Sequence, residues 1–297
     1  MNNQIKNQIY EHLQILKPRI SNSTLTTYSH LLYRLYYNIH DKSEPFEFHF
    51  FGQESNIITY LEKIDPKTRK TILASLIAAS PDKCSLYKKL MINDIKTMKD
   101  IIDTNTKSDS QSKLWITLPE LKKIYNKLYK KISVINIDDV SIDEQQTFQD
   151  LIIIMLTSGL FIPPRRSLDV TEFKIRNIDK KKDNYLSDDT LIYNKYKTKD
   201  TYGEQQVKVD NKDFIDTLNY YIKYINKNDY LLVNRKGNKL NDITLNQRIK
   251  KICNNLGGIN IFRHLYITNM YDQIPDIKKI SEQMGHSIDT QLTYIKK

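Results

Sequence analysis

The sequence predicts a mainly α-helical chain with a small antiparallel sheet, divided into an N-terminal helical domain and a C-terminal α/β domain. Apolar residues recur every three or four positions along most of the chain, which is the pattern of amphipathic helices. Two short runs with the pattern of strands occur only in the second half, and a polar stretch without periodicity separates the two regions. With 297 residues, of which 39% are hydrophobic, each domain is long enough to bury its own core.

Four helices are predicted in the N-terminal domain. The first has Ser23 available as its N-cap, the second stops before Pro66, and the third ends at the step from Ser80 to Pro81. Helices with short connections form a small bundle. Their apolar stripes run over Leu25–Ile39, Ile57–Ile64, Leu73–Ile77 and Tyr87–Ile101.

The apolar pattern disappears between Asp103 and Lys113. This stretch is small and polar, which is the composition of a linker. The sequence therefore predicts a domain boundary here, with residues 1–108 as a helical N-terminal domain and residues 109–297 as a C-terminal domain.

The second domain mixes helices and strands. The expected strands Thr190–Thr198 and Gln205–Val209 form a hairpin around residues 200–203. Gly159 is predicted to end a helix in the position that favours a left-handed residue. Further helical spacings occur over Phe148–Leu156, Leu245–Cys253, Ile261–Gln273, Ile277–Met284 and Ser287–Lys297.

Composition narrows the classes of protein to consider. The longest apolar run, Leu151–Leu156, is too short to span a membrane, and Met1–Ile9 lacks the pattern of a secretion signal. Cys84 and Cys253 are isolated, so we expect an intracellular, reduced setting wherever the target of the protein lies. The net charge is +11, and eight of these charges lie after residue 110. This balance favours a polyanionic partner, of which DNA is the commonest.

Five short segments carry the chemistry, and each is unremarkable when taken alone. Two arginines follow a helix end and two prolines, which suit the first turn of a next helix. A lysine-rich segment lies near the hairpin tip, an arginine enters a helix after a Gly-Gly turn, a histidine follows a glycine, and a tyrosine lies off the apolar stripe of the last helix. The segments are Thr157–Asp169, Tyr196–Lys199, Asn260–His264, Met284–Ser287 and Ser287–Lys297.

In this order and at these separations, the five segments resemble the tyrosine recombinases, the phage-type integrases. The resemblance covers Trp115–Lys297 through its motifs, and the N-terminal helices resemble the core-binding domain of that family more loosely. It implies a catalytic domain that cleaves and rejoins DNA strands through a 3′-phosphotyrosine.

The resemblance also implies a role for each matching residue. Arg166, which precedes the acidic Asp169 by three residues, and Arg263 would hold the phosphate. His286 would donate a hydrogen bond to a non-bridging oxygen, and Tyr294 would be the nucleophile. The lysine that protonates the leaving 5′ oxygen would be Lys197, with Lys199 as the alternative.

The residue types fit this chemistry. Two guanidinium groups bind the oxygens of a phosphate bidentately, which lysines cannot do. A phenol with an ordinary pKa near 10 needs neighbouring cations and a proton acceptor in order to attack at neutral pH. Religation draws on the phosphotyrosine bond, so neither a cofactor nor a metal ion is expected.

The sequence departs from the family at two places. Asn260 stands where the family usually has a histidine or lysine, three residues before Arg263, and asparagine is no general base near neutral pH. Asn260 remains a candidate site residue, and the proton of Tyr294 would pass to another group such as His264 or His286. In addition, only three residues follow Tyr294, so subunit assembly is expected to use surfaces other than a C-terminal helix.

We therefore expect a site-specific recombinase that acts on double-stranded DNA, as a homotetramer, in DNA integration such as that of a viral genome, and with no membrane partner. Two alternatives remain open. A type IB topoisomerase uses a similar residue set as a monomer, and a cleavage-deficient protein of the same fold would only bind DNA.

Overall fold

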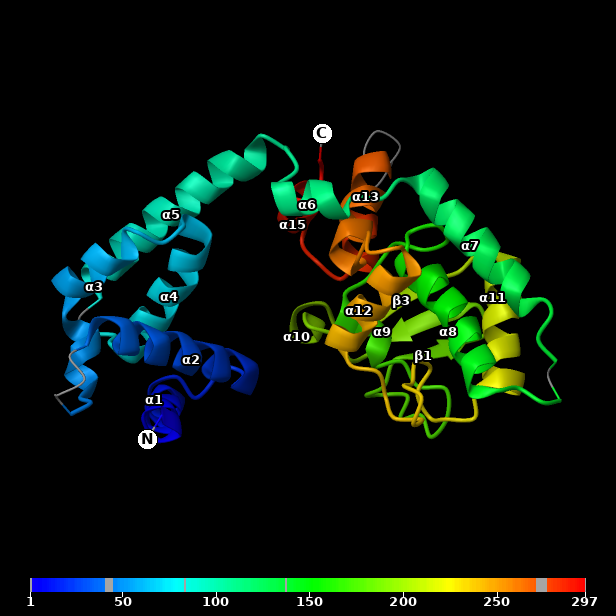
Figure 1. Cartoon of the computed structure of the whole chain (residues 1–297), viewed down its shortest axis with the longest axis horizontal. Helices are drawn as coiled ribbons and strands as arrows, with labels where there is room; N and C mark the ends of the chain where they lie inside the picture. The colour runs from blue at the N-terminus through cyan, green and yellow to red at the C-terminus, as the bar shows by residue number, and fades with distance from the viewer. Residues whose placement is uncertain (1, 41–44, 83, 137, 271–276, 297) are drawn as a thin grey trace. The chain divides into compact units, whose positions relative to one another are not determined.

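A computed structural model of the chain describes residues 2–40, 45–82, 84–136, 138–270 and 277–296 (Figure 1). The chain forms two compact units, Met1–Thr104 and Asn105–Lys297. Among the described residues, the model contains no helix that is both long and apolar enough to cross a membrane.

Unit 1 is a helical bundle. Its core joins side chains of all its α-helices, among them Ile9, Leu32, Ile57, Leu73 and Tyr87. The four predicted helices are present, and a helix at the N-terminus, which the polar opening segment concealed, packs on α2. The elements are α1 (Asn2–Leu16), α2 (Asn22–Ile39), the 3-10 helix η1 (Phe48–Gly52), α3 (Glu54–Leu61), α4 (Pro66–Ala79) and α5 (Ser85–Asp103).

One local prediction in unit 1, the cap at Ser23, was wrong, and the helix after Pro66 begins earlier than its apolar stripe. The N-cap of α2 is Ser21, whose hydroxyl accepts from the amide of Thr24, so the helix begins before Ser23. Pro66 opens α4 as a first-turn residue behind the Asp65 cap. A proline needs no amide partner in the first turn, so it both separates α3 from α4 and starts the second of them.

Unit 2 has a helical core with a three-stranded sheet. Residues Leu151–Leu156 of α8 are all buried. Helix α8 packs against α7 and α12 (Figure 1), and it also contacts η2. The helices are α6 (Asp109–Leu114), α7 (Leu118–Ile132), α8 (Ile142–Thr157), α9 (Ser167–Thr171), α10 (Lys199–Tyr202), α11 (Lys212–Tyr220), the π-helix η2 (Tyr221–Ile225), α12 (Asp242–Ile252), α13 (Ile259–Met270), α14 (Ile277–Gln283) and α15 (Ile288–Leu292).

The strands β1 (Tyr185–Ser187), β2 (Thr190–Tyr193) and β3 (Gln205–Lys208) form one antiparallel sheet in the order β1-β2-β3. The predicted hairpin is confirmed by the pairing of Thr190 with Lys208 and of Tyr193 with Gln205. Its first strand is shorter than predicted, because it ends at Tyr193. Residues 194–204 then form a connection that contains α10.

Three other expectations in unit 2 needed correction. The polar stretch predicted as a linker contains α6, which a capping box formed by Ser108 and Gln111 begins. Pro163 and Pro164 precede α9 instead of forming its first turn. The last helix ends at Leu292, and the predicted buried stripe is wrong, since the side chains of Ile288 and Leu292 are 44% and 43% exposed.

Candidate active site

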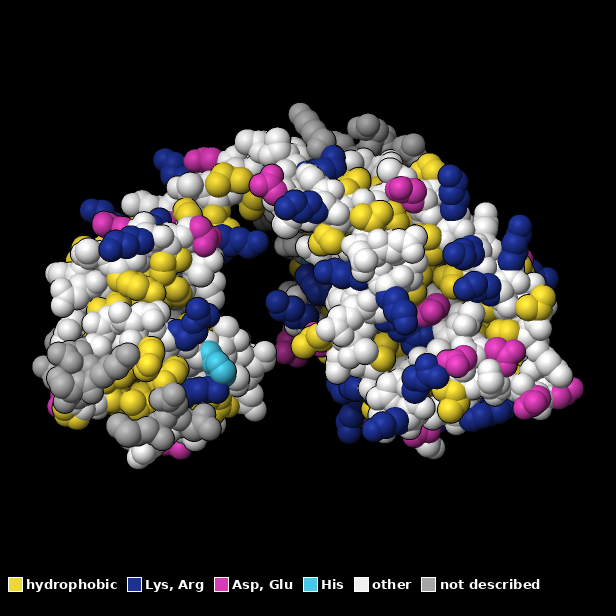
Figure 2. All heavy atoms as spheres, in the orientation of Figure 1, with side chains coloured by type: hydrophobic (Ala, Val, Ile, Leu, Met, Phe, Trp, Pro, Cys, Tyr) yellow, Lys and Arg dark blue, Asp and Glu magenta, His cyan; other side chains and the backbone are white. Residues whose placement is uncertain are grey.

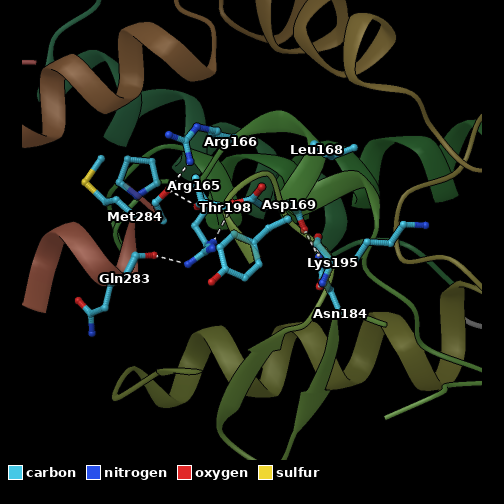
Figure 3. A network of polar contacts seen from close by, with 12 residues as sticks. Arg165, Arg166, Leu168, Asp169, Asn184, Lys195, Thr198, Gln283 and Met284 are labelled. Carbon is cyan, nitrogen blue, oxygen red and sulfur yellow. Dashed lines mark hydrogen bonds and ion pairs between the residues drawn. The ribbon is translucent and has the colours of Figure 1, made fainter. Parts of the chain in front are cut away.

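The two consecutive arginines before α9 have different environments. Arg165 is 1% exposed, and its Nε donates to Asp169 Oδ2 over 3.0 Å while its Nη1 donates to the Gln283 carbonyl over 2.7 Å (Figure 3). Its guanidinium also lies over the rings of Tyr193 and Tyr196, 4.0 and 4.9 Å from their centroids. Two nitrogens of Arg165 are therefore bonded within the protein, and aromatic rings cover its guanidinium.

Arg166 is only half-buried and is the N-cap residue of α9. Its Nη1 donates to the carbonyl of Gly285, which leaves the other guanidinium donors available (Figure 3). Arg166 is therefore the more accessible of the two arginines, while Arg165 keeps one buried nitrogen, Nη2, without a partner among the described residues. The choice of Arg166 as the phosphate ligand remains a prediction from the sequence motif.

Gly285 brings three segments together. Its φ of +68° lies in the left-handed region, and a Cβ at this position would come within 2.8 Å of Arg165 Nη2. The Gly285 carbonyl accepts from Arg166 and, over 3.1 Å, from the hydroxyl of Thr198. Only glycine allows this close approach. Through its carbonyl, Gly285 connects Thr198 of the hairpin connection with Arg166 of the segment before α9.

Arg263 lies on α13 at the centre of the site. It is 1% exposed, and its Nη1 donates to the carbonyls of Pro164 and Met284 over 2.8 and 3.1 Å. Its Nε donates to Tyr294 Oη over 3.0 Å. Burial lowers the pKa of Arg263, and the nearby Tyr294 opposes this effect.

Tyr294 is half-buried just after α15, and its backbone is fastened to α13. Its carbonyl accepts from Nδ1 of His264 over 2.9 Å and from the hydroxyl of Thr268 over 3.4 Å. The Thr268 hydroxyl in turn accepts from the amide of Lys296 over 2.9 Å. The segment after α15 therefore holds the phenol against Arg263 of the same chain.

His286 is 2% exposed and lies beside Tyr294, with the ring centroids 5.4 Å apart. Its Nδ1 is 3.0 Å from the Ser287 carbonyl, and its Nε2 is buried without a partner among the described residues. Burial lowers the pKa of His286 to about 4, and Arg263, Arg166 and Arg165 add to this effect.

The remaining predicted site residues, Lys197 and Asn260, are exposed. Lys197 lies in the hairpin connection next to Thr198, and no bond of its side chain is found among the described residues. Lys199, the alternative, donates from Nζ to Asn194 over 2.8 Å. Asn260 lies in the first turn of α13 with its side chain in solvent. The structure thus brings Arg166, Arg263, His286 and Tyr294 together and leaves Asn260 apart from their hydrogen bonds.

The site has more positive than negative charge. Arg165, Arg166 and Arg263 lower the pKa of the Asp169 carboxyl, although burial outweighs them and raises it. In the described part of the chain, Asp169 is the acidic group that interacts electrostatically with these three arginines. Buried nitrogens of Arg165 and Arg263 have no hydrogen-bond partner there. Uncompensated buried cations are costly, so the site is suited to an anion.

Sequence reasoning used Asp169 only to identify Arg166. It assigned no role to three other residues that organise this site, Arg165, Thr198 and Gln111. The Arg165–Asp169 pair was visible as an i,i+4 spacing of opposite charges. Gln111 lies 2.9 Å from His264 Nε2 and carried no signal in the sequence, since the contact joins positions 153 residues apart.

Comparisons with known proteins agree with this geometry. Residues 168–296 match the model of the phage integrase family, a range that includes Lys197, Arg263, His286 and Tyr294. Among curated proteins, a comparison by sequence finds no match.

Solved structures resemble the whole chain. The Tn1549 transposon integrase in complex with circular intermediate DNA is 16% identical with a TM-score of 0.57, and the alignment covers 98% of this chain and 95% of that one. The same integrase with transposon right end DNA is 15% identical with a TM-score of 0.55, and the alignment covers 98% of this chain and 94% of that one. A lambda integrase tetramer bound to a Holliday junction is 14% identical with a TM-score of 0.52, and the alignment covers 97% of this chain and 75% of that one. At these identities the likeness shows the fold, and the predicted fold class is confirmed.

Proposed function

Residues 168–296 match the phage integrase family, and we propose that the protein is a site-specific DNA recombinase that forms a 3′-phosphotyrosine at Tyr294. The observation that carries the proposal is the contact of Tyr294 Oη with Arg263, a buried cation with one nitrogen that has no partner among the described residues. A phosphodiester would place its negative charge there, next to the phenol that attacks it.

The reaction follows from these positions. Tyr294 Oη attacks the phosphorus, and the bond to the 5′ oxygen breaks. Arg166 and Arg263 stabilise the charge that develops on the non-bridging oxygens, which is the main task of a protein in phosphoryl transfer. Lys197, free on the hairpin connection, protonates the 5′ oxygen as it leaves. A 5′ hydroxyl of another strand reverses these steps and releases the tyrosine.

Binding of duplex DNA draws on basic side chains outside the site. Lysines and arginines are spread over the visible face of unit 2, as Figure 2 shows. The helix α7 alone contributes Lys122, Lys123, Lys127, Lys130 and Lys131. The solved integrases that share the fold are bound to DNA, one of them as a tetramer, and we propose the same partner and assembly for this chain. The affinity for DNA then falls steeply with added salt.

The experiment uses duplexes selected for binding from a random library, each nicked so that cleavage releases a short strand and traps the covalent product. The expected result is a protein–DNA adduct that survives SDS, together with strand exchange between two duplexes at one protein tetramer per pair. Efficient relaxation of supercoiled plasmid by monomer would favour a topoisomerase. Binding without any adduct would favour a protein that has lost cleavage.

A further inference from the structure

The reaction proposed above requires a group that takes the proton of Tyr294, and three side chains are candidates for this role. Asn260 occupies the expected position in the sequence, His264 follows Arg263, and His286 lies beside the phenol. The hydrogen bonds of the site distinguish between them. The inference that follows rests on the proposed function and concerns the same site.

Asn260 is unsuited for two reasons. Its side chain is exposed in the first turn of α13 and has no bond to the site, whereas Arg263, one turn later, is buried. Its amide nitrogen is also a hydrogen-bond donor without a basic lone pair, so the side chain takes up no proton near neutral pH. The proton therefore goes elsewhere.

His264 already uses both ring nitrogens. A carbonyl oxygen only accepts, so the 2.9 Å contact with the Tyr294 carbonyl requires a hydrogen on Nδ1. In the neutral ring Nε2 then accepts, and the amide of Gln111 donates to it over 2.9 Å. Burial lowers the pKa of His264 to about 4, in keeping with a neutral ring. This side chain fixes the position of the Tyr294 backbone and has no lone pair to spare.

His286 differs at one nitrogen. Its Nδ1 faces the Ser287 carbonyl over 3.0 Å and so carries the hydrogen by the same argument. In the neutral ring Nε2 then has a lone pair, and this atom is buried with no donor from the described residues. A buried acceptor without a partner costs free energy, and a role in the reaction would explain why it is kept.

The charged surroundings keep this nitrogen unprotonated at rest. Arg263 faces the ring from α13, Arg165 and Arg166 face it from the segment before α9, and Tyr294 faces it from the segment after α15. Burial is the largest influence and lowers the pKa to about 4. At neutral pH the ring is thus ready to accept a proton.

The phenol is arranged to give up its proton. Tyr294 Oη accepts the hydrogen of Arg263 Nε with one lone pair, which leaves its own O–H free to donate. The two rings lie 5.4 Å apart at an interplanar angle of 36°. Contacts with a general base are commonly loose before the substrate binds and shorten in the reacting complex.

We propose that His286 is the general base of strand cleavage, with Nε2 accepting the Tyr294 proton as Oη attacks the phosphorus. The Oη–P bond forms, the P–O5′ bond breaks, and the 5′ oxygen takes a proton from Lys197. The resulting imidazolium lies beside the new phosphodiester and donates a hydrogen bond to a non-bridging oxygen. When a 5′ hydroxyl attacks, His286 returns its proton to the tyrosine.

This role is distinct from that of a hydrogen-bond donor alone, and glutamine separates the two. The amide of His286→Gln still donates to a phosphate oxygen but takes up no proton. Single-turnover adduct formation is measured from about pH 5.5 to about pH 9.5 on the nicked duplexes described above, and the wild-type rate is expected to be level above neutral pH. His286→Gln is expected to be at least about 100-fold slower at pH 7 and to gain rate as the pH rises, because hydroxide can then take the proton in place of the histidine.

His264→Gln is the matched control, since it removes the other histidine beside Tyr294. Its rate is expected to fall by a similar factor at every pH, with the wild-type pH profile. A His286→Gln profile that parallels the wild type, with only a few-fold loss in rate, would overturn the proposal. Wild-type protein that forms no adduct at all would instead count against the proposed function.

A second measurement uses the wild-type protein and does not depend on the folding of a variant. A duplex with sulfur in place of the bridging 5′ oxygen has a leaving group that needs no protonation, so its cleavage reports the base alone. The proposal predicts that its rate is level at neutral pH and falls as the pH approaches the pKa of His286, about 4. A rate that is still level at about pH 4 would contradict a titrating base.

Discussion

Nε of Arg263 donates a hydrogen bond to the phenol oxygen of Tyr294 over 3.0 Å. The two residues lie on different elements of unit 2, and the backbone of Tyr294 is itself bound to α13 by His264 and Thr268. The phenol and the cation beside it are therefore assembled within one chain before any ligand is bound. Preorganised charge of this kind costs no rearrangement at the moment of reaction.

Replacement of this arginine by lysine is expected to abolish most of the cleavage. Arg263→Lys keeps the charge, but one ammonium group cannot reach Tyr294, Pro164 and Met284 together. We expect adduct formation to slow by about 100-fold or more. Single-turnover kinetics at saturating DNA measure the effect. A rate within a few-fold of the wild type would contradict the role of the Arg263 guanidinium.

Substitution of the two arginines before α9 is expected to lower the free energy of unfolding by different amounts. Arg165→Met leaves Asp169 buried without its partner and should lower the free energy of unfolding by about 3–5 kcal/mol. Arg166→Met removes one bond from a half-buried side chain, and the expected loss is about 1 kcal/mol. Urea unfolding measures both values.

The same pair separates folding from catalysis. Arg166→Met is expected to stay folded and to lose cleavage, because it removes the donors that face the ligand. If Arg166→Met proved the less stable of the two variants, the assignment of Arg165 to the core and Arg166 to the phosphate would be reversed.

The stability of unit 2 is expected to fall in mild acid. His264 has a pKa of about 4 in the folded protein, below its ordinary value of 6.5. Between these values the unfolded chain binds the proton and the folded chain does not, so the stabilisation is present above pH 6.5 and is lost as the pH falls towards 4. The effect is at most about 3 kcal/mol. Urea unfolding at neutral pH and at about pH 4.5 should show a smaller drop for His264→Gln than for the wild type.

Gln111 is expected to influence the nucleophile although it lies on α6. Gln111→Ala removes the donor to His264 Nε2 and so loosens the side chain that holds the Tyr294 carbonyl. We expect adduct formation to slow by roughly tenfold, the equivalent of about 1.4 kcal/mol. Binding of DNA should be unchanged, which a titration at constant salt measures. The neighbouring Ser110→Ala is the control, because the Ser110 side chain has no contact with His264.

The sequence predicted those parts of the fold that follow from local pattern. Leu151–Leu156 and the pairing of β2 with β3 belong to this group, since periodicity and turn residues are properties of neighbouring positions. The ends of elements were less accessible. The last helix stops at Leu292 because the backbone of the next residues bonds to α13, and no spacing within the segment records that contact.

The candidate residues could be chosen from their order along the chain, but their surroundings could not be predicted from it. Arg166, Arg263, His286 and Tyr294 lie together as expected. What the sequence left undecided was the state of the histidines, because it depends on which carbonyl or amide each nitrogen meets. Those partners, Ser287 for one ring and Gln111 for the other, come from folding.

The identity of the residue that becomes linked to DNA tests the account most directly. Adduct formed on a nicked duplex is digested with protease and nuclease, and mass spectrometry locates the nucleotide on the peptide. The account predicts a nucleotide on Tyr294 in the wild type and no adduct in Tyr294→Phe, which keeps the fold and DNA binding. An adduct that persists in Tyr294→Phe, or a nucleotide found on another side chain, would contradict it.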